Sequence, residues 1–356
     1  MNTAITRAKG SGAGTAGVTH PHHPKGLRVA ILGAGLMGRW HADAARAVGA
    51  KVVAVADPDF DAARRVAGRQ ATVHAGLEPL LDSARPDVLH ICSPSATHPE
   101  AIALALDRGV AVLVEKPLAA TASETQHFYA MSRAAGVLLC PVHQYAFQDC
   151  LAPVIAAPSR CGTVERVALV FQSAGAATVS PDAWPGVAAD ILPHPLAILQ
   201  RLWPDYAQMA EDWTVSALGP GGWRLSNAAG PAHADITISL AARPTEASLT
   251  VWGSEGAWEV DLFHGFARFR DGTATRASKA LRPLVDGLGL FGHAAANLMG
   301  RAIRREAAYP GLRALVARTY AAVADPEQVP IRPEEAIAVA EIRDRFLATV
   351  TRGGPR

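Results

Sequence analysis

The stretch RVAILGAGLMG (28–38) decides the fold of the first half of this 356-residue chain. Its first five residues form a short apolar run that is typical of a buried strand, and GAGLMG leads directly into the helix-like segment GRWHADAARAVG. Glycine-rich hexapeptides also occur by chance, but the pattern G-x-G-x-x-G between a strand and a helix is typical of a dinucleotide-binding turn. The context therefore predicts the first strand, turn and helix of a Rossmann domain.

The glycines of this hexapeptide have distinct physical roles in such a turn. Gly33 permits the tight turn, Gly35 lets the backbone approach a pyrophosphate, and Gly38 lets the helix pack close to the strand. The N–H groups at the start of a helix have no partner within it, so they can bind phosphate oxygens. The predicted phosphate-binding residues are Gly33, Gly35, Leu36, Met37 and Gly38.

A carboxylate at the end of the second predicted strand indicates which dinucleotide binds. The run KVVAVAD (51–57) ends in Asp57, which follows Gly38 by 19 positions, close to the offset of about 20 expected for the ribose ligand. A carboxylate there accepts hydrogen bonds from the ribose hydroxyls and repels a 2′-phosphate. Pro58 and Asp59 follow, with no Arg or Ser to bind that phosphate. The sequence therefore predicts NAD rather than NADP as the cofactor.

The remainder of the first half continues the alternation of strands and helices. Two of the helical segments begin with the spacing of a capping box, Thr97 with Glu100 and Thr121 with Glu124. Strands that alternate with helices of 10–15 residues indicate right-handed βαβ units and a doubly wound parallel sheet. The further strands are predicted at 71–76, 87–93, 111–117 and 137–147.

After about residue 150 the pattern changes to consecutive strands. In 234–240, Ile236, Ile238 and Leu240 fall on one face and polar residues on the other. Such alternation, with tight turns between successive strands, is typical of an antiparallel sheet, and helices return over roughly 291–350. We therefore predict an α/β protein with a flexible tail (1–26), an NAD-binding Rossmann domain (27–148) and an α+β domain for substrate binding and oligomerisation on a mostly antiparallel open sheet (149–350).

Composition and charge argue against several other classes of protein. Hydrophobic residues make up 49% and charged residues 19% of the chain, which is typical of globular proteins. The net charge is only +2, and no basic run with interleaved aromatics suggests nucleic-acid binding. No apolar run reaches the roughly 20 residues of a membrane span, and the first residues lack the apolar segment of an export signal. We expect a cytoplasmic protein without a metal site whose cysteines, Cys92, Cys140, Cys150 and Cys161, are reduced.

Three motifs together resemble those of a known family. GAGLMG after the first strand, SPSATH (93–98) after the fourth and EKPLA (115–119) after the fifth are similar to motifs of the Gfo/Idh/MocA (glucose–fructose oxidoreductase/inositol dehydrogenase) family. The resemblance covers both predicted domains. It implies NAD-dependent chemistry on a small hydroxylated molecule, and a homo-oligomer in which the sheet of the second domain packs against another subunit.

The resemblance also implies a catalytic set that combines residues of both domains. Lys116 follows the fifth strand, at the edge of an open α/β sheet where ligands bind. The family's Asp-x3-His segment corresponds to DILPH (190–194), so His194 would be the general acid/base, Lys116 would stabilise alkoxide charge, and Asp190 would orient the pair. Prolines flank His194, so a helix is expected to begin there. The alternatives are a solvated Lys116, a helix-capping Asp190 and a merely packed His194.

Further contacts follow from the same resemblance. Cofactor contacts are implied for Ser93, Pro94, His98, Glu115 and Lys116, and substrate contacts for His143, Gln144 and Tyr145. For His98 the alternative is a side chain at the start of a helix. For His143, Gln144 and Tyr145 the alternative is packing in the core or between domains. Many family members have an arginine near the position of Ala146, so this chain's substrate is left open.

Three hypotheses for the function remain. The leading one is an NAD(H)-dependent oxidoreductase that transfers a hydride to or from a secondary hydroxyl of a sugar, inositol or related polyol. The second is a redox-neutral NAD-dependent glycosidase or epimerase of the same family, which would release no net NADH. The third is a non-catalytic NAD-binding regulatory protein, which would tolerate the loss of Lys116.

Overall fold

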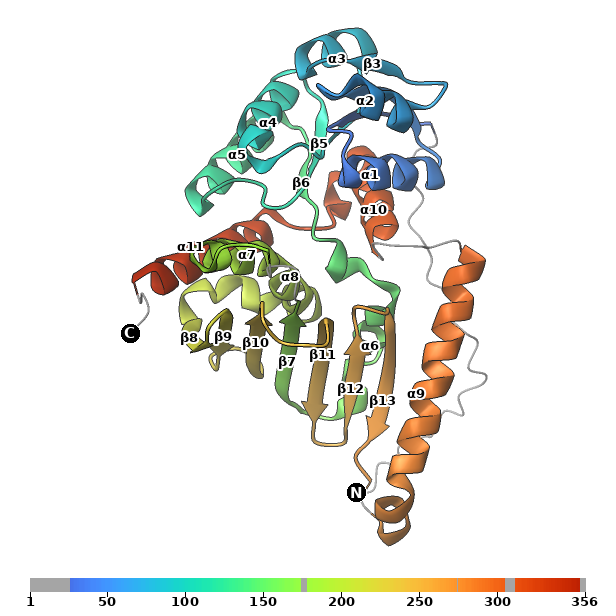
Figure 1. Cartoon of the computed structure of the whole chain (residues 1–356), viewed down its shortest axis with the longest axis vertical. Coiled ribbons are helices and arrows are strands. Elements are labelled where there is room, and N and C mark those ends of the chain that lie inside the picture. The colour runs from blue at the N-terminus through green and yellow to red at the C-terminus, as the bar shows by residue number, and fades with distance from the viewer. Residues whose placement is uncertain (1–25, 174–177, 274, 305–310, 353–356) are drawn as a thin grey trace, which may run out of the picture.

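The computed structural model describes residues 26–173, 178–273, 275–304 and 311–352. Two sheets dominate these residues, and Figure 1 shows the first of them, with its helices, above the second. The tail predicted over residues 1–26 lies outside the described residues, apart from Gly26.

The first sheet has six parallel strands in the order β3-β2-β1-β4-β5-β6, which confirms the predicted Rossmann domain. Its strands are continuous apolar runs because helices cover both faces, and Val29, Ala30 and Ile31 are fully buried. The strands are β1 (Arg28–Leu32), β2 (Lys51–Ala56), β3 (Thr72–His74), β4 (Val88–Ile91), β5 (Ala111–Val114) and β6 (Leu139–Pro141), and the helices are α1 (Leu36–Ala47), α2 (Phe60–Ala67), α3 (Leu77–Ala84), α4 (His98–Asp107) and α5 (Ala122–Ala135).

One of the two predicted helix caps is confirmed and the other is wrong. The hydroxyl of Thr121 accepts a hydrogen bond from the backbone N–H of Glu124 at 3.2 Å and so caps α5. Thr97 makes no such bond, because the 3-10 turn η1 (Ser95–Thr97) runs straight into α4 and leaves Thr97 with near-helical backbone angles. Its hydroxyl instead donates to the carbonyl of Pro94 at 2.8 Å.

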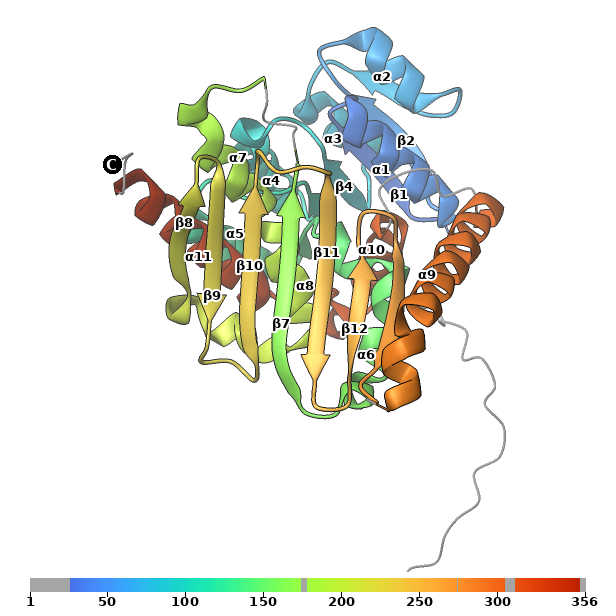
Figure 2. The same ribbon diagram turned by 60° about the horizontal axis from the view of Figure 1, so that its bottom comes forward.

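The second sheet has seven strands in the order β13-β12-β11-β7-β10-β9-β8. Neighbouring strands are antiparallel except for the central pair β7 and β10, so the prediction of a mostly antiparallel sheet is confirmed. Figure 2 shows helices behind one face of this sheet and the other face turned toward the viewer. The strands are β7 (Val164–Gln172), β8 (Thr214–Gly219), β9 (Gly222–Asn227), β10 (His233–Ser239), β11 (Glu246–Gly253), β12 (Gly256–Asp261) and β13 (Phe266–Asp271).

Strand β10 shows how the alternating pattern builds this domain. Ile236 and Ile238 are fully buried against the covering helices, as predicted. Asp235 points to the other face, yet it is also buried, because Arg166 and Arg224 bind its carboxylate at 3.1 Å and 2.6 Å. The polar face of the strand is therefore held by ion pairs rather than left to solvent.

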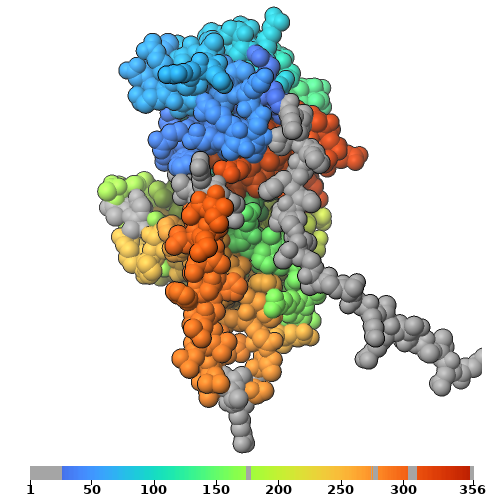
Figure 3. Space-filling view, turned by 90° about the vertical axis from the view of Figure 1, so that its right-hand side faces the viewer, coloured from blue at the N-terminus to red at the C-terminus, as the bar shows by residue number. Residues whose placement is uncertain are grey.

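Helix α9 (Arg276–Arg304) begins well before residue 291, where the helical region was expected to start. Pro283 and several glycines lower the helix propensity of this segment, but the helix continues through them. Its polar residues face the sheet: Arg270 of β13 pairs with Asp286, and Asn297 donates to the carbonyl of His264 at 2.8 Å. Figure 3 shows α9 on the surface of the molecule. Its exposed apolar side chains include Leu284, Val285, Leu288, Phe291, Leu298, Met299 and Ile303.

The last helices of the chain connect the two sheets. Helix α10 (Leu312–Ala324) packs against α1 of the Rossmann domain, and α11 (Pro333–Arg352) packs against α5, α7 (Trp184–Ile191) and α8 (Pro193–Leu202). Among the described helices, none combines the length and the apolarity needed to cross a bilayer. Lys116, just after β5, binds Asp190 of α7, and α8 contacts the 3-10 turn Gln144–Phe147 after β6, so this edge of the parallel sheet lies next to α7 and α8.

Candidate active site

The glycine-rich turn between β1 and α1 has the form of a phosphate cradle. Gly33 has a φ of +94°, and a Cβ there would lie 2.6 Å from the backbone nitrogen of Ser93, so only glycine fits. A Cβ on Gly38 would overlap the carbonyl of Gly33. Gly35 differs, because a Cβ there would meet no atom within 4 Å among the described residues. The fold thus needs Gly33 and Gly38, whereas the missing side chain of Gly35 leaves open space at the start of α1, which fits a pyrophosphate.

Asp57 lies beside this turn. One carboxylate oxygen accepts a hydrogen bond from the backbone N–H of Ala34 at 2.6 Å, and the other accepts from the N–H of Asp59 at 2.8 Å. These bonds fix the carboxylate next to the phosphate cradle, while the side chain stays partly exposed. The position fits the ribose of a dinucleotide and places a negative charge where NADP would bring a phosphate.

We predict that Asp57→Asn relaxes the preference for NAD over NADP by about tenfold, because the charge that repels the 2′-phosphate is removed. Calorimetric titration with each dinucleotide measures the ratio of the two dissociation constants. Asp61→Asn, an exposed position in the following helix, is the matched control. An unchanged ratio in the Asp57 variant would contradict the role given to this carboxylate.

Lys116 and Asp190 connect the two domains. The ammonium of Lys116, just after β5, donates to a carboxylate oxygen of Asp190 at 2.6 Å and to the backbone carbonyl of the same residue at 3.0 Å. The lysine side chain is only 18% exposed, whereas that of Asp190 is 52% exposed. Lys116 is therefore not the solvated loop lysine of the alternative hypothesis.

The two helices around this ion pair explain the position of Asp190. Asp190 lies in the last turn of α7, and α8 begins at Pro193 with Leu192 as its N-cap residue. The predicted start of a helix beside His194 is thus confirmed, but the alternative role of Asp190 as its cap is wrong. Pro193 suits this position because the first residues of a helix need no N–H donor.

His194 lies in the first turn of α8, beside two aromatic rings. The centre of its ring is 4.6 Å from that of Tyr145 and 6.5 Å from that of Phe171. Its Nδ1 atom is buried and finds no hydrogen-bond partner in the described part of the chain. Burial, together with the charge of Lys116 and the proximity of His143, lowers the pKa of His194 well below its usual value. The ring is therefore neutral at neutral pH and can accept a proton.

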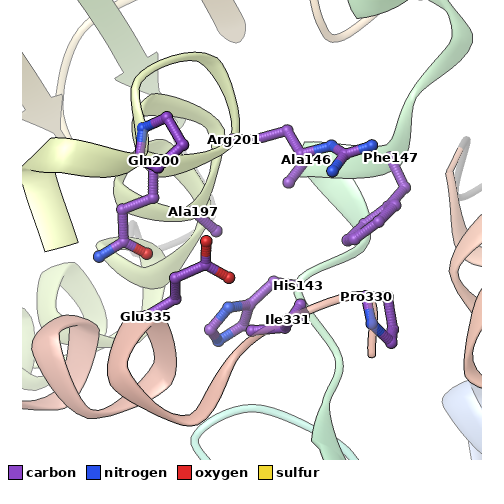
Figure 4. A pocket seen from close by; sticks show the side chains of 10 residues that line it. His143, Ala146, Phe147, Ala197, Gln200, Arg201, Pro330, Ile331 and Glu335 are labelled. Atoms are coloured by element: carbon purple, nitrogen blue, oxygen red, sulfur yellow. The ribbon is translucent and has the colours of Figure 1, made fainter. Parts of the chain in front are cut away.

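His143 follows β6 and is buried. Burial lowers its pKa to about 4, with a further decrease from Lys116 and an opposing effect of Glu115. The ring also lines a small open pocket, to which Gln200, Arg201 and Glu335 contribute (Figure 4). His143 therefore lines this pocket and lies close enough to Lys116 to feel its charge, and its contact with a substrate stays a prediction.

The lowered pKa of His143 predicts a pH dependence of stability. Between pH 6.5 and about 4 the unfolded chain binds a proton on this residue and the folded protein does not, so stability is lost as the pH falls. The full difference corresponds to about 3 kcal/mol. Urea unfolding at several pH values should therefore show a shallower pH dependence in His143→Gln than in the wild type. His127→Gln, at an exposed position, is the control, and parallel curves for all three proteins would contradict the prediction.

The other predicted cofactor residues form the loops around the cradle. The two ring nitrogens of His98 lie 3.0 Å from the carbonyl oxygen of Ser93 and 2.9 Å from that of Pro117. This buried ring thus joins the loop after β4 to the loop after β5. Pro94 is exposed in the first of these loops. Direct contacts of these residues and of Glu115 with a cofactor stay predictions.

The structure brings some of the predicted substrate residues together and adds one. Tyr145 lies against His194, whereas the backbone carbonyl of Gln144 faces Gly311. Phe171 was not predicted as a site residue, although the alternating pattern of β7 places it on the buried face of that strand. Within the described residues no group of three or more His, Cys, Asp or Glu side chains is arranged to hold a metal ion, and no disulfide joins the four cysteines.

Comparison with known proteins shows similarity to one family model and to several relatives. Residues 27–143 match the family model of the oxidoreductase family with an NAD-binding Rossmann fold, GFO_IDH_MocA. An inositol 2-dehydrogenase of Saccharopolyspora erythraea is 40% identical over 96 residues, which are 26% of this chain and 28% of that protein. An inositol 2-dehydrogenase of Streptomyces avermitilis is 43% identical over 96 residues, again 26% of this chain and 28% of that protein. The alignments thus span less than a third of the length of these relatives.

Solved structures extend the likeness in fold to both domains. A levoglucosan dehydrogenase, in complex with NADH and levoglucosan, superposes with a TM-score of 0.68 at 17% identity, covering 92% of this chain and 98% of that one. The phosphate cradle, the carboxylate at the end of β2 and the family match all indicate NAD as the cofactor. Over residues 27–143 the chain therefore matches the NAD-binding Rossmann domain of the Gfo/Idh/MocA oxidoreductases.

Proposed function

We propose that this protein is an NAD(H)-dependent dehydrogenase that acts on a secondary hydroxyl of a sugar, inositol or related polyol. The observation that carries the proposal is the ion pair between Lys116 and Asp190, 2.6 Å apart, beside the neutral ring of His194. This arrangement lies at the edge of the NAD-binding sheet, where open α/β folds bind their ligands. The family of the Rossmann domain and the names of its relatives support the same class of reaction.

The side chains present suit the removal of a proton from an alcohol. His194 is neutral, so it accepts the hydroxyl proton as general base and returns it in the reverse direction. Lys116 holds a positive charge next to it and stabilises the negative charge that develops on the substrate oxygen. Asp190 orients the ammonium through the short hydrogen bond. Bound NAD, held by the Gly33–Gly38 turn and Asp57, supplies the acceptor for the hydride.

The walls of the site support a cyclic polyol as substrate. Tyr145 and Phe171 present aromatic rings near His194, and their ring centres lie 5.7 Å apart. Aromatic faces pack well against the C–H face of a sugar or inositol ring, while Asp190 and Lys116 provide polar partners for hydroxyl groups. Inositol and levoglucosan, named for the relatives above, are both ring compounds with several hydroxyls.

A panel of inositols, sugars and sugar acids tests the proposal. Purified protein is mixed with NAD and each compound, and the absorbance of reduced nicotinamide is followed. We expect at least one cyclic polyol to give stoichiometric NADH. Consumption of a compound without NADH would favour the redox-neutral alternative, and no reaction with any compound would contradict the dehydrogenase proposal.

A further inference from the structure

Four buried polar side chains form an unbroken hydrogen-bonded chain beneath Lys116. The hydroxyl of Tyr320 lies 2.9 Å from Nε2 of His90, Nδ1 of His90 lies 3.0 Å from Nδ1 of His41, and Nε2 of His41 lies 3.1 Å from Oε1 of Glu115. The first three residues are fully buried and Glu115 is 8% exposed. They come from α10, β4, α1 and the end of β5, so this chain, which we call the relay, crosses the Rossmann core.

The chemistry of these groups leaves one order of donors when both rings are neutral. A carboxylate only accepts hydrogen bonds, and a neutral imidazole has one donor and one acceptor nitrogen. Burial, with His41 alongside, lowers the pKa of His90 well below its usual value, so that ring is neutral. If Nε2 of His41 donates to Glu115, its Nδ1 accepts from His90. Nε2 of His90 then accepts from the hydroxyl of Tyr320.

The relay ends on the turn that carries the lysine. Oε1 of Glu115 accepts from His41, and Oε2 accepts from the backbone N–H of Lys116 at 3.2 Å. A buried carboxylate with donors on both oxygens is held in one rotamer, and it holds the backbone that donates to it. The position of the Lys116 backbone therefore depends on the whole relay, up to a hydroxyl from the C-terminal part of the chain.

We propose that Tyr320, His90, His41 and Glu115 form a one-directional donor relay that fixes the Lys116 turn, which makes Tyr320 a positioning residue for the lysine. The effect on turnover rests on the proposed function, but the order of donors does not. A buried polar chain of this kind gives a unique arrangement only while every member is paired. Removal of the terminal hydroxyl leaves a lone pair of His90 unsatisfied and loosens the carboxylate at the other end.

Nitrogen NMR of the histidine rings tests the order of donors. Long-range proton–nitrogen spectra of histidine-labelled protein distinguish a protonated from an unprotonated ring nitrogen. We expect His41 to donate from Nε2 and to accept at Nδ1, and His90 to carry its proton on Nδ1. A charged His41, or a proton on Nε2 of His90, reverses the relay and overturns the inference.

Tyr320→Phe tests the connection to the lysine, because it removes only the hydroxyl. We expect the Nε2 signal of His90 and the backbone amide signal of Lys116 to shift, and kcat to fall about tenfold, the equivalent of one hydrogen bond, with NAD affinity unchanged. Tyr129→Phe is the matched control, since that buried hydroxyl has no hydrogen-bond partner among the described residues.

The outcomes separate the relay from the proposed function. An unmoved Lys116 amide in Tyr320→Phe, or equal shifts in the Tyr129 control, overturns the positioning role. If the wild type oxidises no polyol, the proposed function fails, and the ring-nitrogen and amide signals still decide the relay.

Discussion

Replacement of Lys116 by methionine is expected to lower kcat by about 10²–10³-fold, because the positive charge next to the substrate oxygen is lost. NAD affinity should change less than about threefold, since the glycine turn and Asp57 are the predicted contacts of the phosphates and the ribose. Methionine keeps most of the length of the side chain. Asp190 is 52% exposed, so water can solvate its carboxylate when the ion pair is gone. Steady-state kinetics and calorimetric titration with NAD measure the two effects.

Lys51→Met is the matched control for this experiment. Lys51 begins β2, is exposed and lies outside the proposed site, so its replacement should leave both kcat and NAD affinity unchanged. If Lys116→Met kept wild-type turnover, the proposed mechanism would fail. A regulatory NAD-binding protein would then be the better hypothesis.

Gly35→Val is expected to weaken NAD binding by about 100-fold, equivalent to about 3 kcal/mol. The reason is steric: the space beside Gly35 is open in the protein itself, so a valine side chain fits the free chain but would occupy the place predicted for the pyrophosphate. The backbone of Gly35, with φ −68° and ψ −160°, is accessible to any residue. Calorimetry measures the affinity, and urea unfolding measures the stability.

Gly76→Val provides a closely matched control. Gly76 is also an N-cap residue with extended backbone, makes no side-chain cap and has open space around its Cβ position within the described structure. Both variants should lose no more than about 1 kcal/mol of stability, the usual cost of a poor N-cap residue. If both bound NAD as the wild type does, the phosphate cradle would be wrongly assigned.

The features predicted well from the sequence are local ones. RVAIL coincides with β1, and the hexapeptide after it forms the turn that its glycines require. Asp57 and Lys116 were found because each lies within two residues of the end of a strand, and the end of a parallel strand fixes which edge of the sheet a residue reaches. Thr121 caps α5 because its backbone is extended, as a cap requires.

The features that were missed depend on contacts between distant segments. His41 and His90 lie in a helix and a strand that look like ordinary core elements, and only the packing of α1 on β4 brings their rings together. Phe171 reaches His194 through the packing of β7 against α8. Thr97 had the right spacing for a cap, but the 3-10 turn before α4 was not visible in the spacing.

The origin of Tyr320 has a consequence for protein synthesis. Its partner His90 leaves the ribosome 230 residues earlier, together with the rest of the parallel sheet. During translation the nascent chain can therefore complete all six strands, and with them the cradle for the cofactor, while the final member of the relay has not yet been made. If the proposed relay holds, the turn that bears the lysine reaches its final order only after α10 has emerged.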